Sequence, residues 1–259
     1  MLNFENKVAL ITGGGSGIGM ETSMAFSRAG AKVAVVDMDQ EKGEETVSQI
    51  RASGGDAMFI NADVSQAADV ERYVGETVAR FKQIDSFFNN AGISGPITHI
   101  PDYPEVAFDR VMDINVKGVF LGLKYVLPVM IRQKSGSVIN MSSTSGIRGY
   151  PGLAAYTASK HAVIGLTRVA AGEVAKNNIR VNAVCPGPVN TNLLGALQDK
   201  KKPDKEKLKQ LKQFSNINTP FGRFAEVDEV AKVVLFLASE HAGFLNGVAL
   251  PIDAGITAI

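Results

Sequence analysis

Three residues near the middle of the chain have the types and spacing needed to move a proton to or from a C–O group: Ser143, Tyr156 and Lys160. If the segment around the tyrosine is helical, Tyr156 and Lys160 share one face, because residues four apart on a helix are neighbours. A free tyrosine has a pKa of about 10, and a nearby ammonium group lowers it. A serine hydroxyl beside the phenol can orient a carbonyl oxygen. Together they predict acid–base catalysis on a C–O group.

Taken alone, the tyrosine–lysine pair is more typical of a solvated helix face, but the N-terminal region supports the catalytic interpretation. Lys7–Thr12 is a short apolar run suited to a buried parallel strand, and residues 20–29 read as a helix. The glycine-rich loop between them, residues 13–19, predicts backbone N–H groups and a helix N-terminus facing a phosphate. A simple tight turn is the alternative interpretation of this loop.

A second strand, residues 31–36, follows the helix and ends in Asp37. This carboxylate lies roughly 20 residues beyond the glycine loop, where an acid can accept hydrogen bonds from an adenosine ribose.

Strand-like and helix-like segments alternate along the chain, which predicts an α/β fold: a doubly wound parallel sheet with helices on both faces. The predicted strands are Val8–Ile11, Lys32–Val36, Ala57–Asn61, Ser86–Asn89, Ser137–Met141, Arg180–Val184 and Val248–Pro251. Right-handed crossovers place the loops after these strands at one edge of the sheet, where ligands bind. We find no internal repeat and no linker, so residues 1–259 are predicted to form a single domain.

Short motifs recur in a fixed order over nearly the whole chain. They are Thr12-Gly13-x-x-x-Gly17-Ile18-Gly19, Asp63-Val64, Asn89-Asn90-Ala91-Gly92, Asn115, Ser143, Tyr156-x-x-x-Lys160 and Pro186-Gly187. Their order and spacing resemble the short-chain dehydrogenase/reductase family. The resemblance implies a single Rossmann-like domain and nicotinamide-dependent chemistry between alcohols and carbonyl compounds.

The same resemblance implies a role for each matching residue. Tyr156 resembles the general acid in reduction and base in oxidation, and Lys160 the residue that lowers its pKa and binds the nicotinamide ribose. Ser143 resembles the hydroxyl that orients the carbonyl; the spacing of thirteen residues to Tyr156 selects it over Ser142. Asn115 matches the position that holds a helix kink and a water in a proton relay.

Cofactor contacts are implied along five loops. They are Gly13, Ser16, Gly17, Ile18 and Gly19 for the pyrophosphate; Asp37 and Met38 for the adenosine ribose; Asp63 and Val64 for the adenine; Asn89, Ala91 and Gly92 beside the ribose; and Pro186, Gly187, Val189 and Thr191 for the carboxamide, with Tyr156 and Lys160. Asp63 also reads as a turn or N-cap residue, and the two roles are compatible.

The acid at the end of the second strand favours NAD(H) over NADP(H). A 2′-phosphate next to Asp37 meets a like charge, whereas a 2′-hydroxyl can donate to it. The basic residues usual for the phosphorylated cofactor are absent nearby, since Ser16 occupies the loop position and Met38 follows Asp37.

Composition excludes several other classes of protein. The formal net charge of +1 argues against general binding to nucleic acid or to an anionic membrane, and no apolar run reads as a transmembrane span. A single cysteine, Cys185, allows no intramolecular disulfide and suits a reducing compartment, so we expect a cytoplasmic protein. Three scattered histidines predict no catalytic metal.

One polar, lysine-rich stretch, residues 192–216, interrupts the α/β pattern. It reads as a solvated helical excursion, or as a small helical lid over the substrate, which the resemblance favours. The expected substrate-contacting residues are Ile93, Ser94, Ser145, Ile147, Val189 and Leu193.

The leading hypothesis is an NAD-dependent dehydrogenase or reductase for a secondary alcohol and its ketone, apolar or cyclic. The alternatives are a 3-oxoacyl-carrier-protein reductase that uses NADPH, and a non-catalytic nucleotide-binding scaffold. The resemblance also implies a homotetramer, with helices near Phe108–Ile131 and Ala155–Ala175 as the dimerising pair. Small residues such as Ala158, Ala162 and Gly165 allow close packing there.

Overall fold

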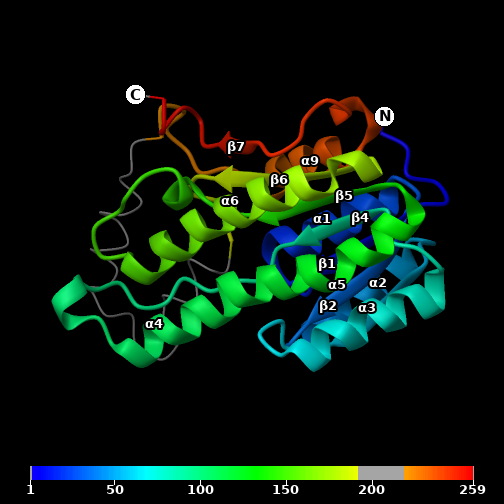
Figure 1. The fold of residues 1–259 in the computed structure, drawn as a ribbon, viewed down its shortest axis with the longest axis horizontal. Coiled ribbons are helices and arrows are strands. Elements are labelled where there is room, and N and C mark those ends of the chain that lie inside the picture. Colours follow the sequence, from blue (N-terminus) through cyan, green and yellow to red (C-terminus); the bar gives the residue numbers. More distant parts are fainter. Residues whose placement is uncertain (1, 192–218, 259) are drawn as a thin grey trace.

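Seven parallel strands form one sheet in the order β3-β2-β1-β4-β5-β6-β7 (Figure 1). The strands are β1 (Val8–Thr12), β2 (Lys32–Asp37), β3 (Ala57–Asn61), β4 (Ser86–Asn89), β5 (Gly136–Met141), β6 (Ile179–Pro186) and β7 (Ala249–Ile252). The computed structural model describes residues 2–191 and 219–258. All seven predicted strands are confirmed, and the largest difference is β6, which continues to Pro186.

The helices fill the connections between strands. They are α1 (Gly17–Arg28), α2 (Gln40–Ala52), α3 (Ala67–Phe81), α4 (Glu105–Met112), α5 (Gly118–Gln133), α6 (Ala154–Val174) and α9 (Val227–Ala238). A π-helical turn, η2 (Asp113–Lys117), joins α4 to α5; short 3-10 turns occur at η1 (Ile100–Asp102), η3 (Thr144–Gly146), η4 (Ala175–Asn177) and η5 (Glu240–Ala242).

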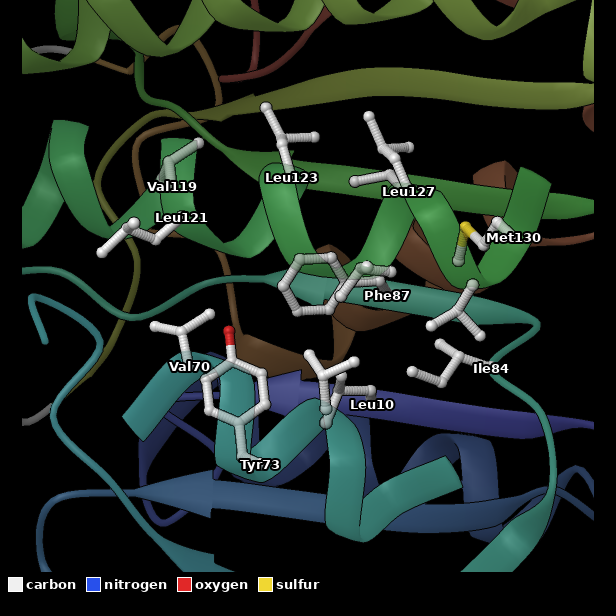
Figure 2. Packing of buried hydrophobic residues seen from close by; sticks show 14 of the residues in the cluster. Leu10, Val70, Tyr73, Ile84, Phe87, Val119, Leu121, Leu123, Leu127 and Met130 are labelled. Carbon is white, nitrogen blue, oxygen red and sulfur yellow. The ribbon is translucent and has the colours of Figure 1, made fainter. Parts of the chain in front are cut away.

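Two hydrophobic cores lie on opposite faces of the sheet, because alternate residues of a strand point to opposite sides. Val8 and Leu10 join the core beneath α3 and α5, whereas Ala9 and Ile11 join the core that contains residues of α1, α2 and α9. Figure 2 shows side chains of α3 and α5 gathered around Leu10 of β1 and Phe87 of β4. A strand buried on both faces must be apolar throughout, which explains the apolar runs in the sequence.

The strand order reverses at β1, whose two neighbours are β2 and β4. The chain after β1 therefore leads to one side of the sheet and the chain after β4 to the other. The resulting crevice at the carboxyl ends of the strands is the usual ligand site in an open α/β sheet.

The sequence analysis found no apolar run that reads as a transmembrane span. The continuous helical segment from Glu105 to Gln133 corrects this, because by length and composition alone it is long and apolar enough to cross a membrane. Its apolar content has another explanation in this fold. Val119, Leu123, Val126 and Leu127 of α5 are buried in the core beneath the sheet. This segment is a core helix with an apolar composition.

Candidate active site

The ends of β1 and β4 are tied together at the crevice by two side chains. The Thr12 hydroxyl accepts the backbone N–H groups of Asn90 and Ala91 at 3.0 and 3.1 Å. In return, the Asn90 amide donates to the carbonyls of Thr12 and Gly13 at 2.9 and 3.2 Å. Sequence analysis noted both residues as motif positions but gave them no role; the structure shows that they hold the glycine loop in place.

The glycine loop has the shape of a phosphate-binding turn. Gly13 and Gly17 adopt positive φ angles of 64° and 52°, which favour glycine. A Cβ on Gly19 would lie 2.0 Å from the Gly13 carbonyl oxygen, so a side chain there is excluded. The next helix, α1, begins at Gly17 with no side-chain cap from Ser16 and no acid in its first turn.

Because its first N–H groups have no side-chain acceptor among residues 2–191 and 219–258, the N-terminus of α1 can receive an anion. Thr191, after β6, approaches the same loop: its Cγ2 atom lies 3.5 Å from where a Cβ on Gly17 would stand. These residues fit the pyrophosphate of a dinucleotide, and Ile18 lies among them on the first turn of α1.

Asp37 ends β2 beside the loop, as predicted. Its two carboxylate oxygens accept the backbone N–H groups of Gly15 and Asp39, both at 2.9 Å. The neighbouring Met38 is 62% exposed, so its side chain can pack against the adenosine end of a dinucleotide. Asn61 donates to the carbonyls of Asp37 and Met38 at 3.3 and 3.0 Å and fixes the backbone of this corner.

The Asp63 carboxylate forms the predicted turn, because it accepts the N–H and hydroxyl groups of Ser65 at 2.9 and 2.8 Å. Val64 is buried and packs against the backbone of Gly118. The adenine contact expected of both residues stays a prediction.

The Asn89 side chain is used inside the fold, and the expected contact of this residue beside the ribose stays a prediction. Its side chain is 2% exposed and donates to the Val119 carbonyl at 3.0 Å and to the Asn140 side chain at 3.2 Å. The amide is therefore used inside the fold, and only its main chain is left for a ligand. Asn90, one residue later, supplies the side chain at the crevice. A side chain at Gly92 would be tightly packed, since a Cβ there would lie 3.1 Å from the Asn115 Oδ1 atom.

Ser143 caps the turn η3 at the carboxyl end of β5. Its hydroxyl accepts the Ser145 N–H at 3.1 Å and contacts the Pro186 carbonyl at the long distance of 3.5 Å. Ser142 has a different role, because its hydroxyl donates to the Lys160 carbonyl at 2.9 Å and anchors α6. The Ser143 hydroxyl favours the phenolate of Tyr156 and acts to lower its pKa. The choice of Ser143 over Ser142 as the carbonyl-orienting hydroxyl stays a prediction.

Tyr156 and Lys160 lie one turn apart on α6, and the Lys160 Nζ atom is 5.4 Å from the centre of the tyrosine ring. Burial raises the Tyr156 pKa above its ordinary value, against the smaller lowering effect of Ser143. The sequence analysis expected the Lys160 ammonium group to lower the Tyr156 pKa, so the direction of the shift is the opposite of the expected one. Lys160 is 3% exposed, and burial lowers its own pKa to about 8, which weakens the charge that the prediction relied on.

Lys160 uses one of its three N–H donors within the described fold, in a 2.8 Å hydrogen bond to the Met141 carbonyl. Its Nζ atom is 3.5 Å from the position of a Cβ on Gly92, so the ammonium lies beside the loop that follows β4. A ligand in the crevice can therefore be offered a donor from this buried group.

Asn115 lies in the π-helical turn η2 between α4 and α5, where the helix kink is expected. Its side chain is fully used: it accepts the Ile93 N–H at 2.8 Å and donates to the Ile93 carbonyl at 2.8 Å and the Ser159 hydroxyl at 3.0 Å. Ser159 in turn donates to the Tyr156 carbonyl at 2.7 Å. Sequence analysis missed this link, which connects the kink to the helix that carries the tyrosine. The proton-relay role of Asn115 stays a prediction.

The expected substrate side is only partly described. Ser145 and Val189 are buried at 4% and 7% exposure, and Ile147 is 40% exposed. Ser94 follows Ile93, the residue clamped by Asn115, and its hydroxyl contacts the Gly95 carbonyl at 3.3 Å. Leu193 and the predicted lid, residues 192–216, lie outside the described residues.

The carboxyl end of β6 contributes Pro186 and Gly187. The Gly187 N–H donates to the Ile252 carbonyl at 3.0 Å, which fixes this turn against β7. Cys185 just before it is fully buried, and burial raises its pKa to about 11, so it is a packed thiol rather than a thiolate. Within residues 2–191 and 219–258, no group of three His, Cys, Asp or Glu side chains is placed to hold a metal.

Comparison with known proteins identifies the fold family. Residues 13–257 match the family described as enoyl-(acyl carrier protein) reductase. Levodione reductase from Leifsonia aquatica is 41% identical over 98% of this chain and 96% of its own. The chain belongs to the short-chain dehydrogenase/reductase family. It is accordingly an oxidoreductase of the kind that acts on alcohols and ketones.

Other members are similar along their full length. A 2,5-dichloro-2,5-cyclohexadiene-1,4-diol dehydrogenase from Sphingobium indicum is 40% identical over all of both chains. The crystal structure of levodione reductase has a TM-score of 0.91 at 40% identity, covering 99% of each chain. NAD⁺-bound xylitol dehydrogenase has a TM-score of 0.91 at 36% identity over 97% and 99% of the two chains.

A 3-ketoacyl-(acyl-carrier-protein) reductase from Brucella melitensis, complexed with NADH, has a TM-score of 0.87 at 34% identity over 98% and 100% of the two chains. The predicted family and Rossmann-like fold are confirmed.

Proposed function

We propose that this protein transfers a hydride between NAD(H) and a secondary alcohol or its ketone, with Tyr156 as the general acid and base. The observation that carries the proposal is the placement of Ser143, Tyr156 and Lys160 around one crevice. Lys160 is buried and makes one of its three possible hydrogen bonds within the described residues, and Ser143 acts to lower the pKa of the phenol. Groups with perturbed pKa values and unfinished hydrogen bonding are typical of a catalytic site.

In ketone reduction, the Tyr156 hydroxyl donates its proton to the carbonyl oxygen as charge develops there, and the Ser143 hydroxyl donates a hydrogen bond to the same oxygen. Lys160 stabilises the resulting phenolate by its charge. In oxidation, the Tyr156 phenolate takes the alcohol proton. The bound nicotinamide supplies or accepts the hydride, and the protein supplies position and electrostatics.

The preference for NAD(H) rests on Asp37. Its carboxylate is held by the Gly15 and Asp39 N–H groups, at the place where a ribose would lie. A 2′-phosphate would meet this charge, whereas ribose hydroxyls can donate to it. Solved relatives are described as NAD⁺-bound and as complexed with NADH, which supports the same preference.

For the substrate, we propose an apolar or cyclic alcohol and ketone pair. The expected contacts Ile93, Ile147 and Val189 are apolar, and Ser94 and Ser145 add hydroxyls. One similar protein is named for a cyclohexadiene diol, which supports a ring-shaped substrate.

The direct test is reduction of NAD⁺ over a panel of secondary alcohols and cyclic diols, with Tyr156→Phe beside the wild type. We expect selective turnover that disappears in the variant, and tighter binding of NADH than of NADPH. Full turnover in Tyr156→Phe would contradict the mechanism. Tight NADH binding with no turnover over a broad panel would favour the non-catalytic scaffold instead.

A second candidate is a 3-oxoacyl-carrier-protein reductase, favoured by the similarity to the Brucella melitensis enzyme. An acidic carrier protein could use the lysine-rich stretch at 192–216, which lies outside the described residues. Asp37 disfavours NADPH, the usual cofactor of such enzymes. Higher activity on a carrier-bound ketoacyl chain, with NADPH preferred, would promote this candidate.

We also propose a cytoplasmic homotetramer, in which α4, α5 and α6 form the dimerising surface. Ile100 and Val106 near α4 are 77% and 78% exposed, and a hollow of about 490 Å³ beside them is lined by Phe108, Ala154 and Ala158. Apolar surface of this kind is usually covered by a partner. Sedimentation that shows a monomer would contradict the proposal.

A further inference from the structure

Three charged side chains meet at the carboxyl end of β2: Asp37, Asp39 and Lys42. The Asp37 carboxylate is oriented by backbone, since its oxygens accept the N–H groups of Gly15 and Asp39 at 2.9 Å each. Gly15 also leaves no free space on that side, because a Cβ there would lie 3.0 Å from the Asp37 Oδ2 atom. The direction of this acid is therefore fixed before any ligand arrives.

Lys42 is a basic residue that the sequence analysis did not consider near the ribose site. It lies on the first turn of α2, and its Nζ atom is 2.6 Å from the Asp39 Oδ2 atom. Asp39 also caps α2, because its side chain accepts the Lys42 N–H at 3.2 Å. The Lys42 pKa is raised, first by its hydrogen bond to Asp39 and also, more weakly, by the charge of Asp37.

We propose that Asp39 is a specificity-determining residue that helps to exclude a 2′-phosphorylated dinucleotide, by holding Lys42 in an ion pair beside Asp37. The inference rests on the proposed function, since it concerns the same cofactor site. With Asp39 present, two acids and one base leave a net negative charge at this corner. Without its charge, the corner becomes neutral and Lys42 is free to reach a phosphate, which a lysine binds as a point charge.

The ion pair itself has little to do with folding. Its two side chains are about half exposed, at 56% for Lys42 and 42% for Asp39, and exposed pairs contribute little to stability. The chain contains a close match elsewhere: Arg80 and Asp56 are 2.9 Å apart with exposures of 54% and 40%. Asp56 directly precedes β3, at the opposite edge of the sheet from the crevice. Asp56→Asn is therefore a matched control.

The test is direct titration of NADH and NADPH against the whole protein, followed by nicotinamide fluorescence, with no turnover required. Asp39→Asn removes the charge but keeps a good N-cap and the backbone N–H that binds Asp37. We expect the Kd for NADPH to fall about fivefold and that for NADH to change by less than about twofold. The increase in NADPH affinity should shrink at high salt, because the charges of Asp39 and Lys42 are exposed.

Two further variants decide whether Lys42 is responsible. Asp39→Asn combined with Lys42→Met should return the Kd for NADPH to the wild-type value, and Asp56→Asn should change neither Kd. Asp39→Ser, which also retains an N-cap, serves as a second variant if Asp39→Asn is unfolded by circular dichroism.

An unchanged ratio of the two Kd values in Asp39→Asn and Asp39→Ser would overturn the inference. So would an increase in NADPH affinity that remains when Asp39→Asn is combined with Lys42→Met. Either result leaves the proposed function intact. A wild-type protein that binds neither dinucleotide would instead contradict the proposed function itself.

Discussion

Two buried polar clusters lie side by side on β4, β5 and α6, and they differ in how completely their hydrogen bonds are made. The amide cluster comprises Asn89, Asn140 and Thr167, all at most 2% exposed. Asn140 accepts from Asn89 at 3.2 Å and donates to Thr167 at 2.9 Å, and Thr167 donates to the Val163 carbonyl at 2.8 Å. Each member has a partner in the protein.

The proposed catalytic cluster, called the catalytic cluster below, comprises Ser143, Tyr156 and Lys160. Ser143 and Lys160 are nearly as well buried, at 9% and 3% exposure, but the cluster makes fewer of its possible hydrogen bonds. The Lys160 ammonium makes one hydrogen bond within the described fold, and the Ser143 contact to Pro186 is at the limit of hydrogen-bond length. Burial of polar groups therefore does not by itself identify an active site. A satisfied buried network stabilises the fold, whereas an incomplete one keeps donors for a ligand.

The largest expected effect comes from removing the proton donor of the catalytic cluster. Tyr156→Phe deletes one hydroxyl and keeps the ring, so we expect turnover to fall by about 10³-fold or more. NADH binding should change by less than about threefold, because Lys160 and the glycine loop remain. Steady-state rates on the substrate found in the panel, together with fluorescence titration of NADH, measure the two effects. A parallel loss of cofactor binding would show that the phenol is structural.

The two adjacent serines provide the next comparison. Ser143→Ala removes the hydroxyl that acts to lower the Tyr156 pKa and is proposed to orient the carbonyl, and we expect kcat to fall by about 10²-fold. Ser142→Ala removes only the hydrogen bond to the Lys160 carbonyl, so kcat should stay within about threefold and stability should fall by about 1 kcal/mol. Equal loss of kcat in both variants would mean that the two serines act together.

These residues also show how far the sequence could lead. The strands Ala57–Asn61 and Ser86–Asn89 were predicted to the residue, because each is a short, mostly apolar run between turns. The choice of Ser143 over Ser142 followed from the family spacing. Motif order thus predicted the family and the fold, whereas the roles of the site residues stay a prediction.

What the sequence could not predict is the direction of individual side chains and the balance of charge with burial. Asn89 and Asn90 are adjacent and identical, yet one is buried in the amide cluster and the other holds the glycine loop. The Tyr156 pKa was expected to fall, but burial acts more strongly than its neighbours. The pairing of Lys42 with Asp39 depends on the turn at the start of α2. Each depends on tertiary contacts.

The amide cluster should show the reverse behaviour of the catalytic serine. Asn140→Leu removes the partner of Asn89 and Thr167, so we expect the free energy of unfolding to fall by about 2 kcal/mol. Turnover at 25 °C should stay within about twofold, because no member of this cluster contacts the crevice by its side chain. Urea denaturation and kcat together measure the contrast. A large loss of kcat without loss of stability would place the amide cluster in the catalytic machinery.

Lys160 gives an expected effect on stability that has a definite pH dependence. Its pKa is about 8 in the fold against an ordinary value of 10.5, so the unfolded chain binds more protons between these pH values. The free energy of unfolding should therefore rise as pH increases from 8 to 10.5, because the cost of burying the Lys160 charge disappears.

Lys160→Met should raise the free energy of unfolding by about 1–3 kcal/mol at pH 7, and this difference should shrink by pH 10. The same variant should lose turnover. Urea denaturation of both proteins at pH 7 and pH 10 makes the measurement, and a variant that is less stable at pH 7 would mean that the hydrogen bond to Met141 outweighs the burial of the charge. A catalytic lysine that costs stability would explain why the incomplete cluster, unlike the amide cluster, is retained for chemistry rather than for folding.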